Sequence, residues 1–237
     1  MSLRRSARAA LIAGTLTAGI AWSAAPAAAE RLQLLDGVYR TVPNDTRVAR
    51  GGANQGDPEL LHERPESRVP DTGAASTLDP YKLCQAIGPF RMMAQSKLKL
   101  ELVAASDRLV MLFEDTAHGY LRSLYLGRDH PADFKPHYAF QGDSVARWQG
   151  DDLVIDTVGF NDRTWLNGHV KASDALHLQE RIHPLAGGRY LEYHMTAKDP
   201  KSLARPYSYV RYFERIEEPI QQNVCEIDSD WSPEKGF

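Results

Sequence analysis

Four charged side chains lie within stretches whose apolar residues alternate as they do in β-strands. They are Glu114, Arg122, Asp156 and Glu180. Because successive side chains of a strand point to opposite faces, each charge shares a face with apolar neighbours two positions away. A buried charge must be paired, bind a ligand or shift its pKa. We therefore predict that the three carboxylates and the arginine converge on one barrel lumen as an acid–base site, in which Arg122 stabilises developing negative charge.

The alternative for any one of these acids is a surface or structural ion pair, because both faces of these stretches are partly apolar. Histidine is the usual proton carrier near neutral pH, and three histidines could take part. His118 lies in a turn between two stretches, which would place it at the mouth of the lumen. His177 is the reserve base, on the face opposite Glu180, and His194 is a candidate ligand contact. Their spacing does not suit a metal ion, so we expect neither a metal nor a cofactor.

The remaining candidate ligand contacts are one amide and a set of aromatic residues. They are Tyr125, Trp148, Phe160, Asn161, Trp165 and Tyr209. Aromatic side chains could line a pocket for a small aromatic or terpenoid molecule. They could equally form the core, which is the commoner use of aromatic residues in strands.

Short alternating stretches separated by turn signals predict the elements that hold these residues. The predicted strands cover residues 98–103, 108–114, 121–126, 144–148, 153–158, 175–183, 189–197 and 207–216. We predict an all-β fold, either an antiparallel up-and-down barrel or a strongly bent sheet of the lipocalin type, within a domain of residues 81–237. Residues 30–80 are predicted to be a largely irregular N-terminal arm, because Gly, Pro, Asn and Asp recur there without periodicity.

The first 29 residues predict export. Arg4, Arg5 and Arg8 are followed by an apolar stretch over residues 11–22 and by an A-x-A cleavage site before Glu30. This order is typical of a secretory signal peptide, which implies a periplasmic or secreted protein. The alternative, a membrane anchor, would need a longer apolar run to cross about 30 Å of hydrocarbon.

Export would bring the two cysteines, Cys84 and Cys225, into an oxidising compartment. An even pair of cysteines in an exported chain predicts a disulfide. Two unpaired thiols are the alternative.

The charge of the exported chain bears on its partners. Residues 1–29 hold three of the 28 basic residues and no acidic one, so 25 basic and 31 acidic residues remain. Nucleic acids and anionic membranes require a basic footprint. We therefore expect a small apolar or aromatic molecule as the partner, and neither nucleic acid nor a stable membrane anchor.

One stretch resembles a known family. Residues 143–161 read D-S-V-A-R-W-Q-G-D-D-L-V-I-D-T-V-G-F-N. They resemble a family of exported bacterial proteins of uncharacterised function, whose signature is G-x-S-V-x-R-W-x-G-D-x-L-V-x-D-T-x-G-F-N. Further matching pieces lie at residues 83–84, 88–91, 127–131, 175–177, 180–181, 199–200, 205–206 and 224–225. The resemblance departs at Asp143, Gln149 and Tyr207. It implies export but supplies no reaction and no catalytic residue.

A second likeness is rejected. Residues 142–144, 159–162 and 174–177 look like the GDS, GxND and DxxH blocks of the SGNH hydrolases. In that family the blocks are separated by βα units, for which the sixteen residues between Ser144 and Asn161 leave no room.

Two functions from different classes follow. The first is a cofactor-independent lyase, isomerase or hydrolase that acts on a small aromatic or terpenoid molecule in the lumen by acid–base chemistry. The second is a non-catalytic carrier of a small apolar ligand. Charged groups in the lumen favour the enzyme, whereas an entirely apolar lumen would favour the carrier.

Overall fold

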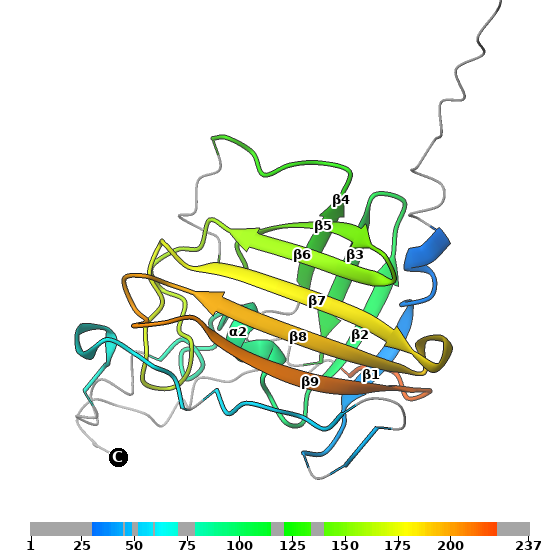
Figure 1. The fold of residues 1–237 in the computed structure, drawn as a ribbon, viewed down its shortest axis with the longest axis horizontal. Coiled ribbons are helices and arrows are strands. Elements are labelled where there is room, and N and C mark those ends of the chain that lie inside the picture. The colour runs from blue at the N-terminus through cyan, green and yellow to red at the C-terminus, as the bar shows by residue number, and fades with distance from the viewer. Residues whose placement is uncertain are drawn as a thin grey trace, which may run out of the picture.

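Nine strands close into a β-barrel in the order of the chain (Figure 1). The computed structural model describes residues 30–44, 46–48, 52–58, 60–70, 79–114, 121–133 and 140–221. The strands are β1 (Gly37–Thr41), β2 (Lys99–Ala104), β3 (Arg108–Phe113), β4 (Leu121–Leu126), β5 (Asp143–Gln149), β6 (Asp152–Val158), β7 (His177–Leu185), β8 (Tyr190–Lys198) and β9 (Tyr207–Ile216). Short helical segments accompany them: η1 (Pro65–Ser67), α2 (Pro89–Met93) and η4 (Ala186–Gly188), with a helical turn at residues 30–32. The prediction of a closed all-β fold is confirmed.

One strand pair differs from the predicted antiparallel order. β4 and β5 run parallel, and they pair over only three residues of each strand, 124–126 with 144–146. A parallel pair needs a connection of a dozen or more residues, which residues 127–142 supply. Every other pair in the barrel is antiparallel.

The predicted N-terminal arm contributes one strand to the barrel. β1 pairs with β2 on one side and with β9 on the other, and so closes the sheet. Its central residue, Tyr39, is fully buried. Beyond Thr41 the described residues of the arm are irregular apart from η1. Isolated β-bridges pair Gln55 with Val210 of β9 and Glu63 with Leu203. No helix in the described part of the chain is long and apolar enough to cross a bilayer.

Alternate residues of the strands fill the barrel with one apolar cluster. It includes Leu100, Met111, Phe113, Leu124, Ile155, Leu178, Met195 and Phe213, each no more than 1% exposed. α2 packs against this cluster with four of its five residues buried, and the hydroxyl of Tyr209 donates to the Phe90 carbonyl at 2.6 Å. Leu32 and Leu35, which precede β1, are also fully buried. The apolar alternation of the strands therefore supplies a core that reaches into the flanking segments.

Gly142 allows the tight entry into β5. Its φ is +67°, and a Cβ at this position would lie 2.8 Å from both the Val158 carbonyl and the Thr157 methyl group. Gly150, with φ +59°, has open space around it. We expect Gly142→Ala to lower the free energy of unfolding by about 3 kcal/mol and Gly150→Ala by about 1 kcal/mol. Urea denaturation of the two variants separates the effect of the steric clash at Gly142 from the effect of a positive φ alone. Equal losses of unfolding free energy would contradict a steric role for Gly142.

Candidate functional site

Two of the four predicted charges meet inside the barrel. Arg122 on β4 donates to both oxygens of Glu180 on β7, with Nη1–Oε2 at 2.7 Å and Nη2–Oε1 at 2.5 Å. The side chains are 1% and 0% exposed. The hydroxyl of Tyr193 on β8 donates to Glu180 Oε2 at 2.7 Å. Burial lowers the pKa of Arg122, but the adjacent carboxylate outweighs it and leaves that pKa above its usual value.

Two hydroxyl groups complete this buried network. Arg122 donates from Nε to Ser144 at 3.2 Å and from Nη2 to Thr157 at 2.8 Å, and Thr157 donates to Glu180 at 3.2 Å. The network therefore links β4, β5, β6, β7 and β8 across the short parallel junction. All its members are enclosed by the core. We interpret it as a structural network that joins the strands of the barrel, because its groups are shielded from solvent.

The other two predicted lumen charges lie elsewhere. Glu114 follows β3 and forms an ion pair with Lys99 at 3.0 Å. Asp156 stands on the outer face of β6, opposite Gln179 of β7. The predicted convergence of four charges is therefore wrong for these two. His118, the predicted histidine at the lumen mouth, lies outside the described residues.

Asp156 belongs to a second set of polar side chains, which we call the outer-face cluster. It consists of Arg128, His130, Asp143, Asp156 and His177. His177 Nε2 lies 2.6 Å from Asp156 Oδ1, and His130 Nε2 lies 3.1 Å from Asp156 Oδ2. The other ring nitrogen of His130, Nδ1, lies 2.7 Å from Asp143 Oδ2. One carboxylate thus stands between two imidazoles that come from the loop after β4 and from β7.

The outer-face cluster is open to solvent at one end and covered at the other. The side chains of His177 and Asp156 are 34% and 36% exposed, whereas that of Asp143 is 8% exposed. Arg128 donates to both oxygens of Asp143 and lies over the ring of Tyr125. Titratable side chains that are accessible, hydrogen bonded to one another and partly desolvated are candidates for acid–base chemistry.

Hydrogen bonding keeps both carboxylates of the cluster ionised. Burial raises the pKa of Asp143, but hydrogen bonds from Arg128 and His130 outweigh it, and the pKa falls below its ordinary value. The pKa of Asp156 is lowered in the same way by His177 and His130, against the effect of burial. Both groups are therefore acceptors at neutral pH.

These lowered pKa values predict a loss of stability in acid. A carboxyl group whose folded pKa lies below its unfolded value of about 3.9 stabilises the fold fully only above that value. The contribution is lost as the pH falls through the folded pKa. Urea denaturation between pH 7 and pH 3 should show a steeper decline for the wild type than for Asp143→Asn. Parallel curves would contradict the assignment for Asp143.

The other histidines on the outer face form pairs outside the cluster. His183 Nδ1 lies 2.6 Å from Asp152, and His194 Nε2 lies 2.6 Å from Glu192. Arg181 joins the two carboxylates, at 3.1 Å from Asp152 and 2.9 Å from Glu192. His194, a predicted ligand contact, is therefore in a surface network, and the His183–Asp152 pair is a natural control for the His177–Asp156 pair.

Most of the predicted aromatic contacts are core residues. Phe160, Trp165 and Tyr209 are at most 2% exposed, which follows the commoner use of aromatic residues. Trp148 is partly buried beneath Arg31, whose guanidinium carbon lies 4.1 Å from the ring centroid. Tyr125 alone among these aromatic residues adjoins the outer-face cluster, through Arg128 at 4.1 Å.

Asn161 is buried and holds the turn after β6. Its side-chain oxygen accepts from the backbone of Arg163 at 3.1 Å and from Thr164 at 3.2 Å. Its Nδ2 has no hydrogen-bond partner in the structure. Asn161 therefore has a local structural role.

Three members of the outer-face cluster were not predicted as site residues. Arg128 and His130 lie in a loop, to which strand periodicity does not apply, and Asp143 begins a strand. The signal that could have found them is the family resemblance, which includes residues 127–131 and marks Asp143 as a departure.

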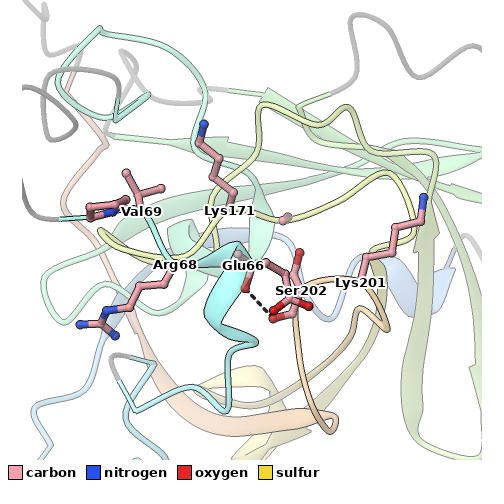
Figure 2. Close-up of a pocket in the computed structure, with 9 residues that line it drawn as sticks. Glu66, Arg68, Val69, Lys171, Lys201 and Ser202 are labelled. Atoms are coloured by element: carbon pink, nitrogen blue, oxygen red, sulfur yellow. Dashed lines mark hydrogen bonds between the residues drawn. The ribbon is translucent and has the colours of Figure 1, made fainter.

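A pocket of about 370 Å³ has a lining that includes no member of either network, and Figure 2 shows that lining. Residues 66–70, 171–172 and 201–202 line it. Two of its three basic residues have carboxylate partners, Arg68 with Glu63 at 2.6 Å and Lys201 with Asp174 at 2.5 Å. The lining contains none of the predicted site residues, and its charges are largely balanced, so we assign no chemistry to it.

Neither a family model nor a curated protein matches the chain. Within the described ranges, no three His, Cys, Asp or Glu side chains are grouped so that they could hold a metal ion. The outer-face cluster is accordingly interpreted from its hydrogen bonds alone.

Proposed function

We propose that this protein is an enzyme that transfers protons on a small aromatic or terpenoid molecule, as a lyase, isomerase or hydrolase, at the outer-face cluster. The observation that carries the proposal is the Asp156 carboxylate between two imidazoles, His130 and His177, at the accessible end of a hydrogen-bonded chain. The proposed site therefore lies on the outside of the barrel rather than in its lumen.

The two histidines suit opposite roles. When His177 donates its Nε2 hydrogen to Asp156, its Nδ1 lone pair is available to take a proton from a substrate. Asp156 then stabilises the imidazolium that forms, as the aspartate of a catalytic triad does. His130 faces a carboxylate from each nitrogen, and both contacts are satisfied when both nitrogens carry hydrogen. In that form His130 supplies the proton for the second half of the reaction: its Nε2 hydrogen passes to Asp156, whose carboxyl protonates the substrate, and the proton that His177 took up returns to His130 through Asp156 when the product leaves.

The substrate class rests on the neighbourhood of the cluster. Tyr125 provides an aromatic surface next to Arg128. The carrier alternative has less support, because large side chains such as Tyr193 and Phe213 occupy the barrel interior around the Arg122–Glu180 pair.

The proposal includes export and a disulfide. The N-terminal 29 residues have the pattern of a cleavable signal peptide, and Cys84 and Cys225 would then mature in an oxidising compartment. Cys225 lies outside the described residues. We expect the unreduced protein to resist alkylation and to take up two alkyl groups after reduction, as measured by mass spectrometry. Two thiols that react without reduction would contradict the bond.

Deuterium exchange tests the enzymatic proposal across many candidate substrates at once. A panel of small aromatic and terpenoid carbonyl compounds, alkenes and esters is incubated with the protein in D₂O and analysed by mass spectrometry. We expect incorporation of deuterium, or conversion to product, for a subset of the panel with the wild type. His177→Gln should abolish it, and His183→Gln, which alters a pair of the same type, should not.

Two results would count against the proposal. One is a panel in which no compound exchanges or reacts above the rate without protein. The other is equal turnover by the wild type and His177→Gln.

A further inference from the structure

One arginine fixes the loop that carries His130 to the barrel. Arg128 donates two hydrogen bonds to Asp143 at the start of β5, at 3.0 Å from Nη1 and 2.5 Å from Nη2. The same guanidinium donates to the carbonyl of Asp129 at 2.9 Å, and its central carbon lies 4.1 Å from the centroid of the Tyr125 ring on β4. Arg128 therefore holds its own loop, β4 and β5 in one arrangement.

Asp143 uses this arrangement to contact one nitrogen of His130. Its Oδ1 accepts from Arg128, and its Oδ2 accepts from Arg128 and lies 2.7 Å from His130 Nδ1. An ionised carboxylate can only accept hydrogen bonds, so the hydrogen of this contact must reside on Nδ1. The partner of one ring nitrogen determines the role of the other. With Nδ1 occupied, Nε2 is the nitrogen that faces Asp156.

We propose that Asp143, held by Arg128, is a positioning residue that fixes the hydrogen on Nδ1 of His130 and aims Nε2 at Asp156. The proposal rests on the proposed function, in which His130 supplies the proton. It differs from a simple ion pair that fastens the loop, because such a pair would alter stability but not the state of the imidazole.

Several charged groups face His130 and must be held constant in the test. They are Asp143 from β5, Asp156 from β6, His177 from β7 through Asp156, and Arg128 from the loop through Asp143. Arg147 on β5 contacts the same loop through Asp129 at 3.5 Å. Its side chain is 61% exposed, so Arg147→Gln is a matched control that removes one arginine next to the same loop.

Side-chain NMR of the histidines is the primary experiment. Long-range ¹H–¹⁵N spectra of the protein distinguish the nitrogen that carries hydrogen from the one that does not. We expect the wild-type protein to show hydrogen on Nδ1 of His130, opposite the Asp143 carboxylate. Asp143→Asn should give a mixture of His130 molecules with and without hydrogen on Nδ1. Arg128→Lys keeps the charge but loses one of the two hydrogen bonds to Asp143, so its proportion of Nδ1-protonated His130 should lie between those of the wild type and Asp143→Asn. Arg147→Gln should match the wild type.

The rate of deuterium exchange on an active compound is the second readout. Asp143→Asn should lower it by on the order of 100-fold and change its dependence on pH, because a misoriented imidazole cannot donate from the required nitrogen. Arg128→Lys should recover part of the rate. Circular dichroism confirms that each variant is folded.

The two readouts separate this proposal from the one on which it rests. If Nδ1 of His130 keeps its hydrogen in Asp143→Asn, the positioning role is overturned, whatever the activity. If the NMR result is as expected and the wild type exchanges no compound, the positioning role stands and the proposed function fails.

Discussion

Replacing Arg122 with alanine is expected to lower the free energy of unfolding by about 3–5 kcal/mol, because the change leaves the Glu180 carboxylate buried without its cation. Glu180 is 2% exposed, and Arg122 supplies two of its hydrogen bonds. Ser144 and Thr157 would lose their donor as well. Urea denaturation followed by circular dichroism measures the loss.

A double variant controls for the charge itself. Arg122→Met with Glu180→Leu removes both charges and keeps apolar volume in the lumen. Replacement of a buried ion pair by apolar residues is often neutral, so this variant should be closer to the wild type than Arg122→Ala. A loss below about 1 kcal/mol for Arg122→Ala would contradict the structural role that we assign to this network.

Much of the barrel could be predicted from the alternation of apolar residues. Eight of the nine strands overlap the predicted ranges, and those at 121–126 and 207–216 have the predicted bounds. β1 was missed because a five-residue strand between a helical turn and a stretch rich in Pro, Asn and Gly leaves too few alternating positions. The parallel pairing of β4 with β5 was missed because a period of two carries no information about strand direction.

The candidate site could be predicted only in part, for a related reason. The alternation correctly placed Arg122 and Glu180 on one face, and it placed Asp156 with Val154 and Val158. Asp156, Val154 and Val158 face outward. On the same outer face, Val145 of the neighbouring strand is only 1% exposed. Apolar residues thus occupy both faces of the sheet near the cluster, and periodicity cannot choose the inner one.

The contacts that the loop of residues 127–133 makes with the cluster could not be predicted from strand periodicity. His130 reaches Asp143 and Asp156 only because residues 127–133 fold back onto β5 and β6. Contacts of this kind depend on the course of the chain between strands, which neither periodicity nor composition determines.

Asp156→Asn is expected to lower turnover by about 10²–10⁴-fold, the usual contribution of a positioned acid–base group. The neutral amide can no longer stabilise an imidazolium on His177 or accept from both histidines. The free energy of unfolding should change by less than about 1 kcal/mol, because the side chain is more than one-third exposed. The measurement is the initial rate of deuterium exchange or product formation on the active compound.

A matched change shows whether the effect belongs to this site. Asp152 lies on the same strand and has a histidine at the same distance of 2.6 Å, His183. Asp152→Asn therefore removes an equivalent surface pair without touching the outer-face cluster, and turnover should stay within about twofold of the wild type.

The most direct test of the account is one comparison of deuterium incorporation by the wild type, Asp156→Asn and Asp152→Asn across the same panel in D₂O. We expect incorporation into at least one compound by the wild type and Asp152→Asn, with a rate at least about 100-fold lower for Asp156→Asn. Equal rates for all three proteins, or no incorporation by the wild type, would contradict the claim that the outer-face cluster is catalytic.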